Sequence, residues 1–152
     1  MSDPRSRQVS KAALMATADE TEASFYEALQ QGDLDRVMSL WADDEEIACV
    51  HPGGPRVVGP GAVRAAFEAV LVSGPLNISI HHVRRLEQAT LAVHHVTEMV
   101  HADTPQGPQT AFVLATNVYM RTDQGWRMVA HHASPGLTQE LPDIVENRGT
   151  LH

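Results

Sequence analysis

The sequence predicts an α+β domain in which helices cover one side of a curved, mostly antiparallel sheet. Two observations predict it. Up to about residue 71, apolar residues mostly recur at helical spacing, whereas from Leu76 onward they alternate with polar residues, as in strands that bury one face. Glycine and proline clusters divide the chain into short elements. Because helices come first and strands follow as a meander, helices and sheet should form separate layers with room for an interior pocket.

Three helices are expected in the first half of the chain. The first runs to Gln31, with Asp19 or Thr21 as its N-cap. The second is short and is capped by Asp33. The third opens at Pro60, because proline suits the first turn of a helix, and it ends before the Ser-Gly-Pro segment at 73–75.

One strand precedes the third helix and four follow it. The strands are expected at residues 45–50, 76–86, 91–102, 110–121 and 126–134. The segments 51–55 and 104–108 are rich in proline and glycine and are expected to be loops, whereas 122–125 should form a hairpin turn. The predicted organisation is an N-terminal arm at 1–17, one domain at 18–136 and a C-terminal tail at 137–152.

Composition excludes some classes of function. The chain of 152 residues has 11 Lys+Arg against 19 Asp+Glu, a formal net charge of −8. Nucleic acids and anionic membrane surfaces are bound largely through Lys and Arg, so neither is an expected partner. Cys49 is the only cysteine, which rules out an intrachain disulfide. With no signal-like or membrane-spanning segment, a cytoplasmic location is expected.

Three stretches resemble the SnoaL-like branch of the NTF2-like superfamily, which includes the ketosteroid isomerases. They are the opening at 25–44 with its Gly-Asp-Leu-Asp turn, the His-Pro-Gly-Gly segment at 51–54 with the start of the third helix at 58–64, and the closing strand with Gly-Trp-Arg-Met-Val at 125–129 and His-Ala-Ser at 132–134. The resemblance implies a cystatin-like cone, an apolar pocket and a homodimer packed sheet to sheet. It does not imply one activity, because this fold hosts many.

The catalytic pair of the ketosteroid isomerases is absent in its usual form. Their helix-one tyrosine would fall at Phe25, one residue short of Tyr26, and their carboxylate base would fall near Cys49, or at His51 if the turn is shifted. The resemblance therefore does not bring that activity to this chain.

Histidine is the unusual feature of the composition, with adjacent pairs at 81–82, 94–95 and 131–132. His51 ends a strand at the expected pocket mouth, and its unperturbed pKa suits proton transfer near neutral pH. His132 alternates in phase with Trp126 and Met128, which predicts that it faces inward and that His131 faces outward. Asn117 interrupts an apolar strand and needs a polar partner. These three residues, His51, His132 and Asn117, are the predicted catalytic set, although stabilising hydrogen bonds would equally explain buried histidines.

Other residues are expected to line the pocket. Glu98 either faces inward, where it could act as a base or orient a histidine, or faces outward as a surface or interface residue, which the sequence favours slightly. Aromatic and apolar side chains would shape the rest of the wall, with core packing as their default role. The full predicted lining is Tyr26, Trp41, Phe67, Glu98, Tyr119, Trp126 and Met128.

A metal hypothesis follows from the histidine pairs. If the strands are neighbours, His82, His94 or His95, and His132 could converge on a zinc-like ion. No compact ligand spacing supports this, and the alternative is a histidine stripe on an outer sheet face buried in a dimer.

The sequence therefore leaves three functions open. The first is a pocket protein for a small apolar molecule with a polar group, acting as an acid–base enzyme of the isomerase, cyclase or dehydratase kind without a cofactor. The second is a non-catalytic binding or dimerisation module. The third is a histidine-ligated metalloenzyme.

Overall fold

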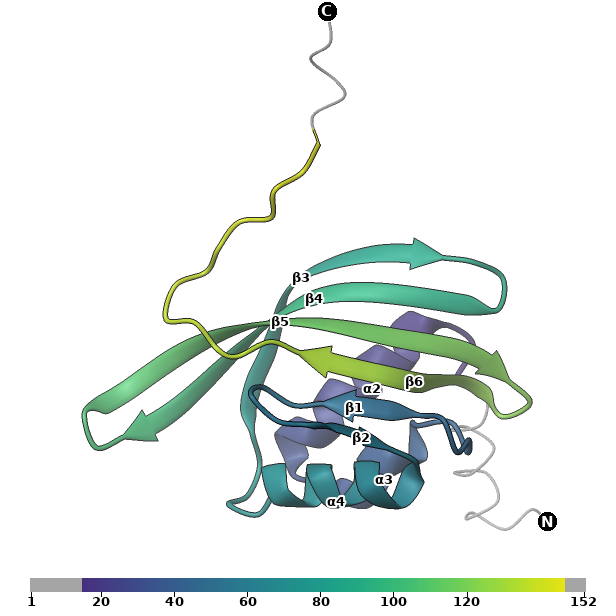
Figure 1. The fold of residues 1–152 in the computed structure, drawn as a ribbon, viewed down its shortest axis with the longest axis horizontal. Helices are drawn as coiled ribbons and strands as arrows, with labels where there is room; N and C mark the ends of the chain where they lie inside the picture. The colour runs from purple at the N-terminus through teal and green to yellow at the C-terminus, as the bar shows by residue number, and fades with distance from the viewer. Residues whose placement is uncertain (1–14, 147–152) are drawn as a thin grey trace, which may run out of the picture.

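The structure is a computed structural model that describes residues 15–146 (Figure 1). Helices α2 (Ala18–Gln31) and α3 (Leu34–Ser39) come first, followed by the short strands β1 (Ala48–Val50) and β2 (Arg56–Val58) and by helix α4 (Pro60–Val70). Four long strands complete the domain: β3 (Asn77–Glu87), β4 (Leu91–Thr104), β5 (Gly107–Thr122) and β6 (Gly125–Ala133).

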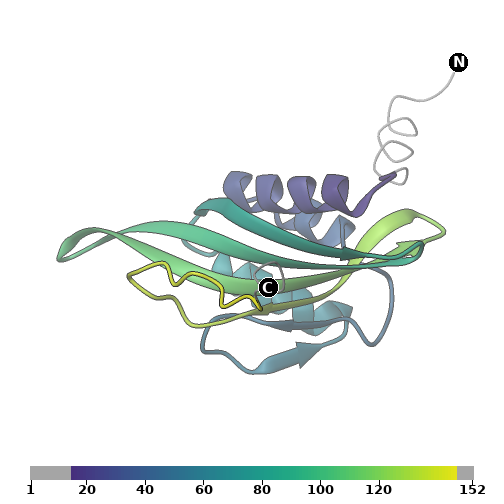
Figure 2. The ribbon, with the colours of Figure 1, turned by 90° about the horizontal axis from the view of Figure 1, so that it is seen from above.

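The strands form one six-stranded sheet in the order β2-β1-β6-β5-β4-β3. All neighbours are antiparallel except β1 and β6, which are parallel. Helix α2 packs against β3 and β6, and α4 packs against the β1–β2 hairpin. The chain after β6 runs along the side of the sheet opposite α2 (Figure 2). The α+β cone predicted from the sequence is therefore confirmed.

An aromatic cluster fills the space between helices and sheet. Phe25 of α2 meets Phe67 of α4 edge to face with ring centroids 5.7 Å apart, and Trp41 lies 6.0 Å from Phe67. All three side chains are buried. Aromatic rings supply large apolar area in few residues, so this cluster holds α2 and α4 together.

The helix ends differ in one detail from the prediction. Thr17, not Asp19 or Thr21, is the N-cap of α2, and its hydroxyl accepts the Glu20 backbone N–H at 3.1 Å. Asp33 caps α3 as predicted, by accepting the Arg36 N–H. Between these helices Gly32 has φ +68, a left-handed conformation that favours glycine. A Cβ at this position would also lie only 3.2 Å from Pro75, so a larger residue would be crowded.

Strands β4 and β5 extend beyond their predicted limits, whereas β1 is shorter than the predicted strand at 45–50. Residues 104–108, expected as a loop, hold only a tight turn, so β4 and β5 form one long hairpin that projects from the body (Figure 1). Strand β2 was not predicted, because three residues between Pro55 and Gly59 give too short a pattern. The pairing of β1 with β6 is non-local and leaves no sequence signal.

Two β-bulges reverse the alternation of sides along β3 and β6. Ile80 pairs with Glu98 and His82 with Thr97, so His81 is an extra residue in β3. Likewise Tyr119 pairs with Met128 and Val118 with Ala130, which leaves Val129 as the extra residue in β6. A bulge inserts one residue and switches the faces of those beyond it.

The bulges correct two predictions. His82 was a candidate metal ligand beside His94 and His132, but the bulge places it on the outer face opposite Thr97, and it is exposed. His132 was predicted to face inward with Trp126 and Met128, but it is exposed and His131 is buried instead. In both strands, the regular alternation of side chains predicts the correct face for residues before the bulge and the wrong face for residues after it.

None of the helices in the described part of the chain is long and apolar enough to cross a bilayer.

Candidate functional site

A group of polar side chains lies buried between α2 and the inner face of the sheet. We call it the interior polar cluster, and its members are Glu22, Tyr26, His94, Glu98, Asn117, Tyr119 and His131. Each is at most 6% exposed. Buried polar groups destabilise a fold unless they are hydrogen-bonded, so such a concentration marks a site with a specific arrangement.

Helical and strand periodicity bring these residues together. Glu22 and Tyr26 are one turn apart on α2 and therefore share its sheet-facing side. On the sheet, Asn117 of β5 is the register partner of both His94 in β4 and His131 in β6. The cluster is thus a polar row across three strands, covered by one helix.

Glu22 is the centre of one half of the cluster. Its Oε2 accepts from the Tyr119 hydroxyl at 2.6 Å and from the Asn117 amide at 3.5 Å, and it lies 3.0 Å from His94 Nδ1. The other ring nitrogen of His94 lies 3.1 Å from Glu87. Burial lowers the pKa of His94, but the hydrogen bond and charge of Glu22, with Glu87 and Asp19, outweigh it and raise the pKa above its usual value. The carboxylates at both ring nitrogens therefore favour the imidazolium form of His94.

A directional chain of hydrogen bonds forms the other half. Because the Asn117 amide oxygen accepts, His131 must donate its Nδ1–H to it. The Asn117 Nδ2 then donates to the Tyr26 hydroxyl at 2.9 Å, and Tyr26 donates to Glu98 Oε2 at 2.6 Å. Burial, with the neighbouring His51 and His132, lowers the pKa of His131 to about 3, so this ring stays neutral.

Among the residues linked by these hydrogen bonds, Glu98 is best placed to exchange a proton near neutral pH. Burial raises the pKa of its carboxyl to about 7, the hydrogen bond from Tyr26 opposes the shift, and the charge of Glu22 adds to it. Burial and the charge of Glu98 raise the pKa of Tyr26 well above its ordinary value. The phenol therefore keeps its proton and remains a hydrogen-bond donor.

His51 lies beside the cluster at the end of β1. Its ring packs edge-on against Phe67 at 4.7 Å and lies 6.0 Å from the ring of His131. Its Nε2 is 3.4 Å from the sulfur of Cys49. Burial raises the pKa of the Cys49 thiol to about 12 and lowers the pKa of His51, so the pair is a neutral thiol beside a neutral imidazole and not an activated nucleophile. His51 is partly exposed, which places it between the cluster and solvent.

The structure brings together many of the residues singled out from the sequence. Asn117, Tyr26, Tyr119 and Glu98 all belong to the cluster, and Glu98 faces inward, the orientation the sequence favoured less. His51 and Phe67 adjoin it. His132 does not, because it lies on the outer face.

The remaining predicted lining residues lie outside the cluster. Met128 and Trp41 are buried in the core, and the Trp41 indole N–H has no hydrogen-bond partner within the described part of the chain. Trp126 is half-buried, and its backbone carbonyl accepts the Thr21 hydroxyl at 2.8 Å.

Sequence reasoning missed Glu22 and the inward orientation of His131. Glu22 stands among apolar residues on the buried stripe of α2, four residues before Tyr26, and a carboxylate there is a readable signal of a buried polar partner. His131 carried no such signal, because its orientation depends on the bulge at Val129.

The predicted histidine metal site is not formed. His94 faces the interior, whereas His82, His95 and His132 are exposed. Within residues 15–146, the groups able to surround one ion are instead His81, His82 and Glu140, and Asp19, Glu87 and His94. In the second group Arg85 already bonds Asp19 at 2.8 Å, and both nitrogens of His94 have partners.

Comparison with known proteins agrees with the fold. The family model of the SnoaL-like domain matches residues 7–138. Among curated proteins, none matches the sequence.

Several solved structures are similar to this chain. A candidate calcium/calmodulin-dependent protein kinase type II association domain from Thiobacillus denitrificans is 35% identical, with 80% of this chain and 96% of that chain covered and a TM-score of 0.72. A candidate dehydratase of the NTF2-like family from Streptomyces avermitilis is 29% identical, with coverages of 76% and 90% and a TM-score of 0.68. An NTF2-like protein of unknown function from Pseudomonas putida is 19% identical, with coverages of 82% and 93% and a TM-score of 0.70, which supports the fold alone.

Proposed function

We propose that this chain, which belongs to the SnoaL-like family of the NTF2-like superfamily, is an acid–base enzyme for a small, largely apolar carbonyl compound. The observation that carries the proposal is the Tyr26–Glu98 pair, in which a buried carboxyl with a pKa of about 7 is bonded to a phenol. Perturbed titratable groups gathered in one place are typical of functional sites.

Glu98 is assigned the role of proton acceptor and donor. A group whose pKa is close to the working pH can take a proton in one step and return it in the next, as isomerisation or dehydration requires. Tyr26 and Asn117 are assigned to the substrate oxygen. Asn117 donates to the Tyr26 hydroxyl and Tyr26 donates to Glu98, so a carbonyl oxygen that accepted from Tyr26 in place of Glu98 would be stabilised as it gained negative charge.

His51 is assigned to the access side of the site. It is the partly exposed neighbour of the buried cluster, so a ligand would approach past its ring. In this role it orients the ligand instead of transferring the proton. No cofactor is needed for this chemistry.

The test has two stages. A thermal-shift panel of cyclic and open-chain ketones should find a compound that stabilises the wild type, by about 2.7 kcal/mol at 100 times its dissociation constant. Exchange of that compound's α-proton with deuterium from the solvent is then followed by NMR. We expect exchange to increase with pH through about 7, as Glu98 ionises.

The variants separate binding from catalysis. Glu98→Gln should retain binding and slow exchange by about a hundredfold or more, whereas Glu68→Gln, on the exposed side of α4, should change neither. Exchange at the wild-type rate in Glu98→Gln would exclude this role for Glu98.

The second candidate function is a non-catalytic module that self-associates through the outer sheet face. The favouring observation is a set of exposed apolar side chains at outward-facing positions of β3, β4 and β5: Leu86, Leu91, Leu114 and Met120. The similarity to an association domain agrees with it. Light scattering on Leu114→Glu should then show smaller particles than the wild type, whereas Val72→Glu, exposed after α4, should not.

A further inference from the structure

The bulge in β3 places two adjacent histidines on the same side of the sheet. On a regular strand, His81 and His82 would point to opposite faces. With His81 as the extra residue, the two ring centroids lie 4.4 Å apart. His81 Nε2 is 3.2 Å from one carboxylate oxygen of Glu140, and His82 Nε2 is 3.2 Å from the other.

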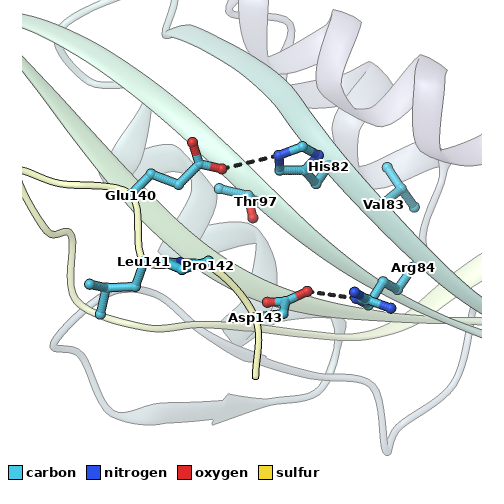
Figure 3. Close-up of a pocket in the computed structure, with 8 residues that line it drawn as sticks. All are labelled: His82, Val83, Arg84, Thr97, Glu140, Leu141, Pro142 and Asp143. Atoms are coloured by element: carbon cyan, nitrogen blue, oxygen red, sulfur yellow. Dashed lines mark hydrogen bonds and ion pairs between the residues drawn. The ribbon is translucent and has the colours of Figure 1, made fainter. Parts of the chain in front are cut away.

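Glu140 comes from the C-terminal segment, which crosses the outer face of the sheet. The backbone of Leu137 pairs with Phe112 of β5, and the chain then continues to β3. Figure 3 shows Glu140 directed at His82 and Asp143 directed at Arg84, with Thr97 of β4 between them. The histidine pair is therefore a point at which the tail meets β3, beside the Arg84–Asp143 ion pair.

The ion-pair contacts at this point would hold the tail only weakly. The side chains of His81, His82 and Glu140 are 42%, 65% and 30% exposed. Exposed pairs of this kind contribute at most about 1 kcal/mol each, because water competes for both partners. Nothing in such pairs requires two imidazoles to converge on one carboxylate.

Convergence of this kind is what a zinc-class cation requires. Zinc binds imidazole nitrogen and carboxylate oxygen at about 2.0 to 2.2 Å, which sets tetrahedral ligand atoms about 3.3 to 3.6 Å apart. The nitrogen-to-oxygen distances here are 3.2 Å, and one ligand atom from each residue lies within 4.8 Å of the others. Exposure leaves the fourth position open to water.

We propose that His81, His82 and Glu140 form a binding site for a zinc-class divalent cation that fastens the C-terminal segment to the outer face of the sheet. The site is separate from the interior polar cluster, which lies on the other face. It also differs from the set expected from the sequence, because its third ligand is a tail carboxylate and not a histidine from another strand.

The binding test uses the untagged full chain and measures Co²⁺ absorption and Zn²⁺ calorimetry. We expect one equivalent of metal to bind and the affinity to fall by at least about tenfold in His82→Ala and in Glu140→Gln. His101→Ala is the matched control, since His101 is an exposed β4 histidine bonded to Thr110, and it should bind as the wild type does. Wild-type affinity in both ligand variants, or an equal loss in His101→Ala, would overturn the site.

A second measurement tests the fastening of the tail. Hydrogen exchange at the amides of residues 137–146 should slow when Zn²⁺ is added to the wild type and should not respond in Glu140→Gln. Because these side chains are at the surface, the metal-free variants should unfold at the wild-type urea concentration. Zinc binding that leaves exchange in the tail unchanged would contradict the fastening role.

Discussion

The raised pKa of the buried Glu98 carboxyl makes the stability of the protein depend on pH. Its carboxyl has a pKa of about 7 in the folded chain, against 4.5 for the unperturbed group, so between these values the folded state binds more protons than the unfolded state. Stability must therefore fall as pH rises through this window, by on the order of 3 kcal/mol in total.

Replacing Glu98 by glutamine should remove this fall. The amide oxygen can still accept the Tyr26 hydroxyl, but the side chain no longer ionises. We expect Glu98→Gln to be more stable than the wild type above pH 7 and equal to it near pH 4.5. Urea unfolding at several pH values measures this, with Glu68→Gln as the control. A variant less stable than the wild type at pH 8 would contradict the account.

His94 contributes a second pH dependence of a different kind. Its pKa is raised in the folded state, so the imidazolium adds stability that is fully present below the unfolded pKa of about 6.5 and is lost as pH rises through the folded pKa. Glu98 makes stability fall with pH below about 7, whereas His94 makes it fall above about 6.5. The two contributions to the pH dependence of stability can therefore be separated.

The His94→Gln variant tests the buried ion pair with Glu22. Removing the imidazolium leaves the Glu22 carboxylate with only its Tyr119 and Asn117 bonds, a change that typically costs about 3 kcal/mol or more for a buried pair. The loss should be largest at pH 6 and smaller at pH 8.5 in urea unfolding. His101→Gln should be neutral. An equal loss at both pH values would show that shape, not charge, is what His94 contributes.

At the scale of single elements, the bulges decide which histidines can act together. With regular pairing beyond Met128, His132 would lie on the inner face opposite Ala115, and His131 would lie on the outer face opposite Thr116. The strands themselves follow from local alternation and turn residues, which is why the meander could be predicted. A bulge depends on pairing with a distant strand, so neither this inversion nor that at His81 could be read from the sequence.

Because the bulge in β6 places His131 inside and His132 outside, replacing each by alanine should change the stability of the protein by very different amounts. His131→Ala removes the hydrogen-bond donor to the buried Asn117 oxygen and leaves a cavity beside Phe25, so we expect a loss of about 2 to 4 kcal/mol. His132→Ala should change stability by less than about 0.5 kcal/mol, because the side chain is exposed. Urea unfolding of both variants measures the difference, and the reverse order would place His132 in the interior.

At the scale of the whole molecule, the sheet separates two functional layers. The inner face carries the polar cluster, and the outer face carries the exposed apolar side chains. Figure 2 shows α2 and the C-terminal segment on opposite sides of the sheet. Composition and motif order predicted the layers. The sites within them depended on contacts between residues far apart in the chain, such as Tyr26 with Glu98, for which the sequence gives candidates but no pairing.

This separation predicts that the tail can be removed without disturbing the cluster. Ending the chain after Leu137 retains the backbone pair with Phe112 and deletes the ion pairs of Glu140 and Asp143 with β3. Because distant sites are usually additive, the fall in stability between pH 4.5 and 7 that Glu98 causes should be unchanged. The outer face should associate more strongly, since residues 143–146 border the same hollow as Leu114. Light scattering over a range of concentrations and urea unfolding measure the two effects. A changed pH dependence in the shortened chain would mean that the two faces of the sheet are energetically coupled.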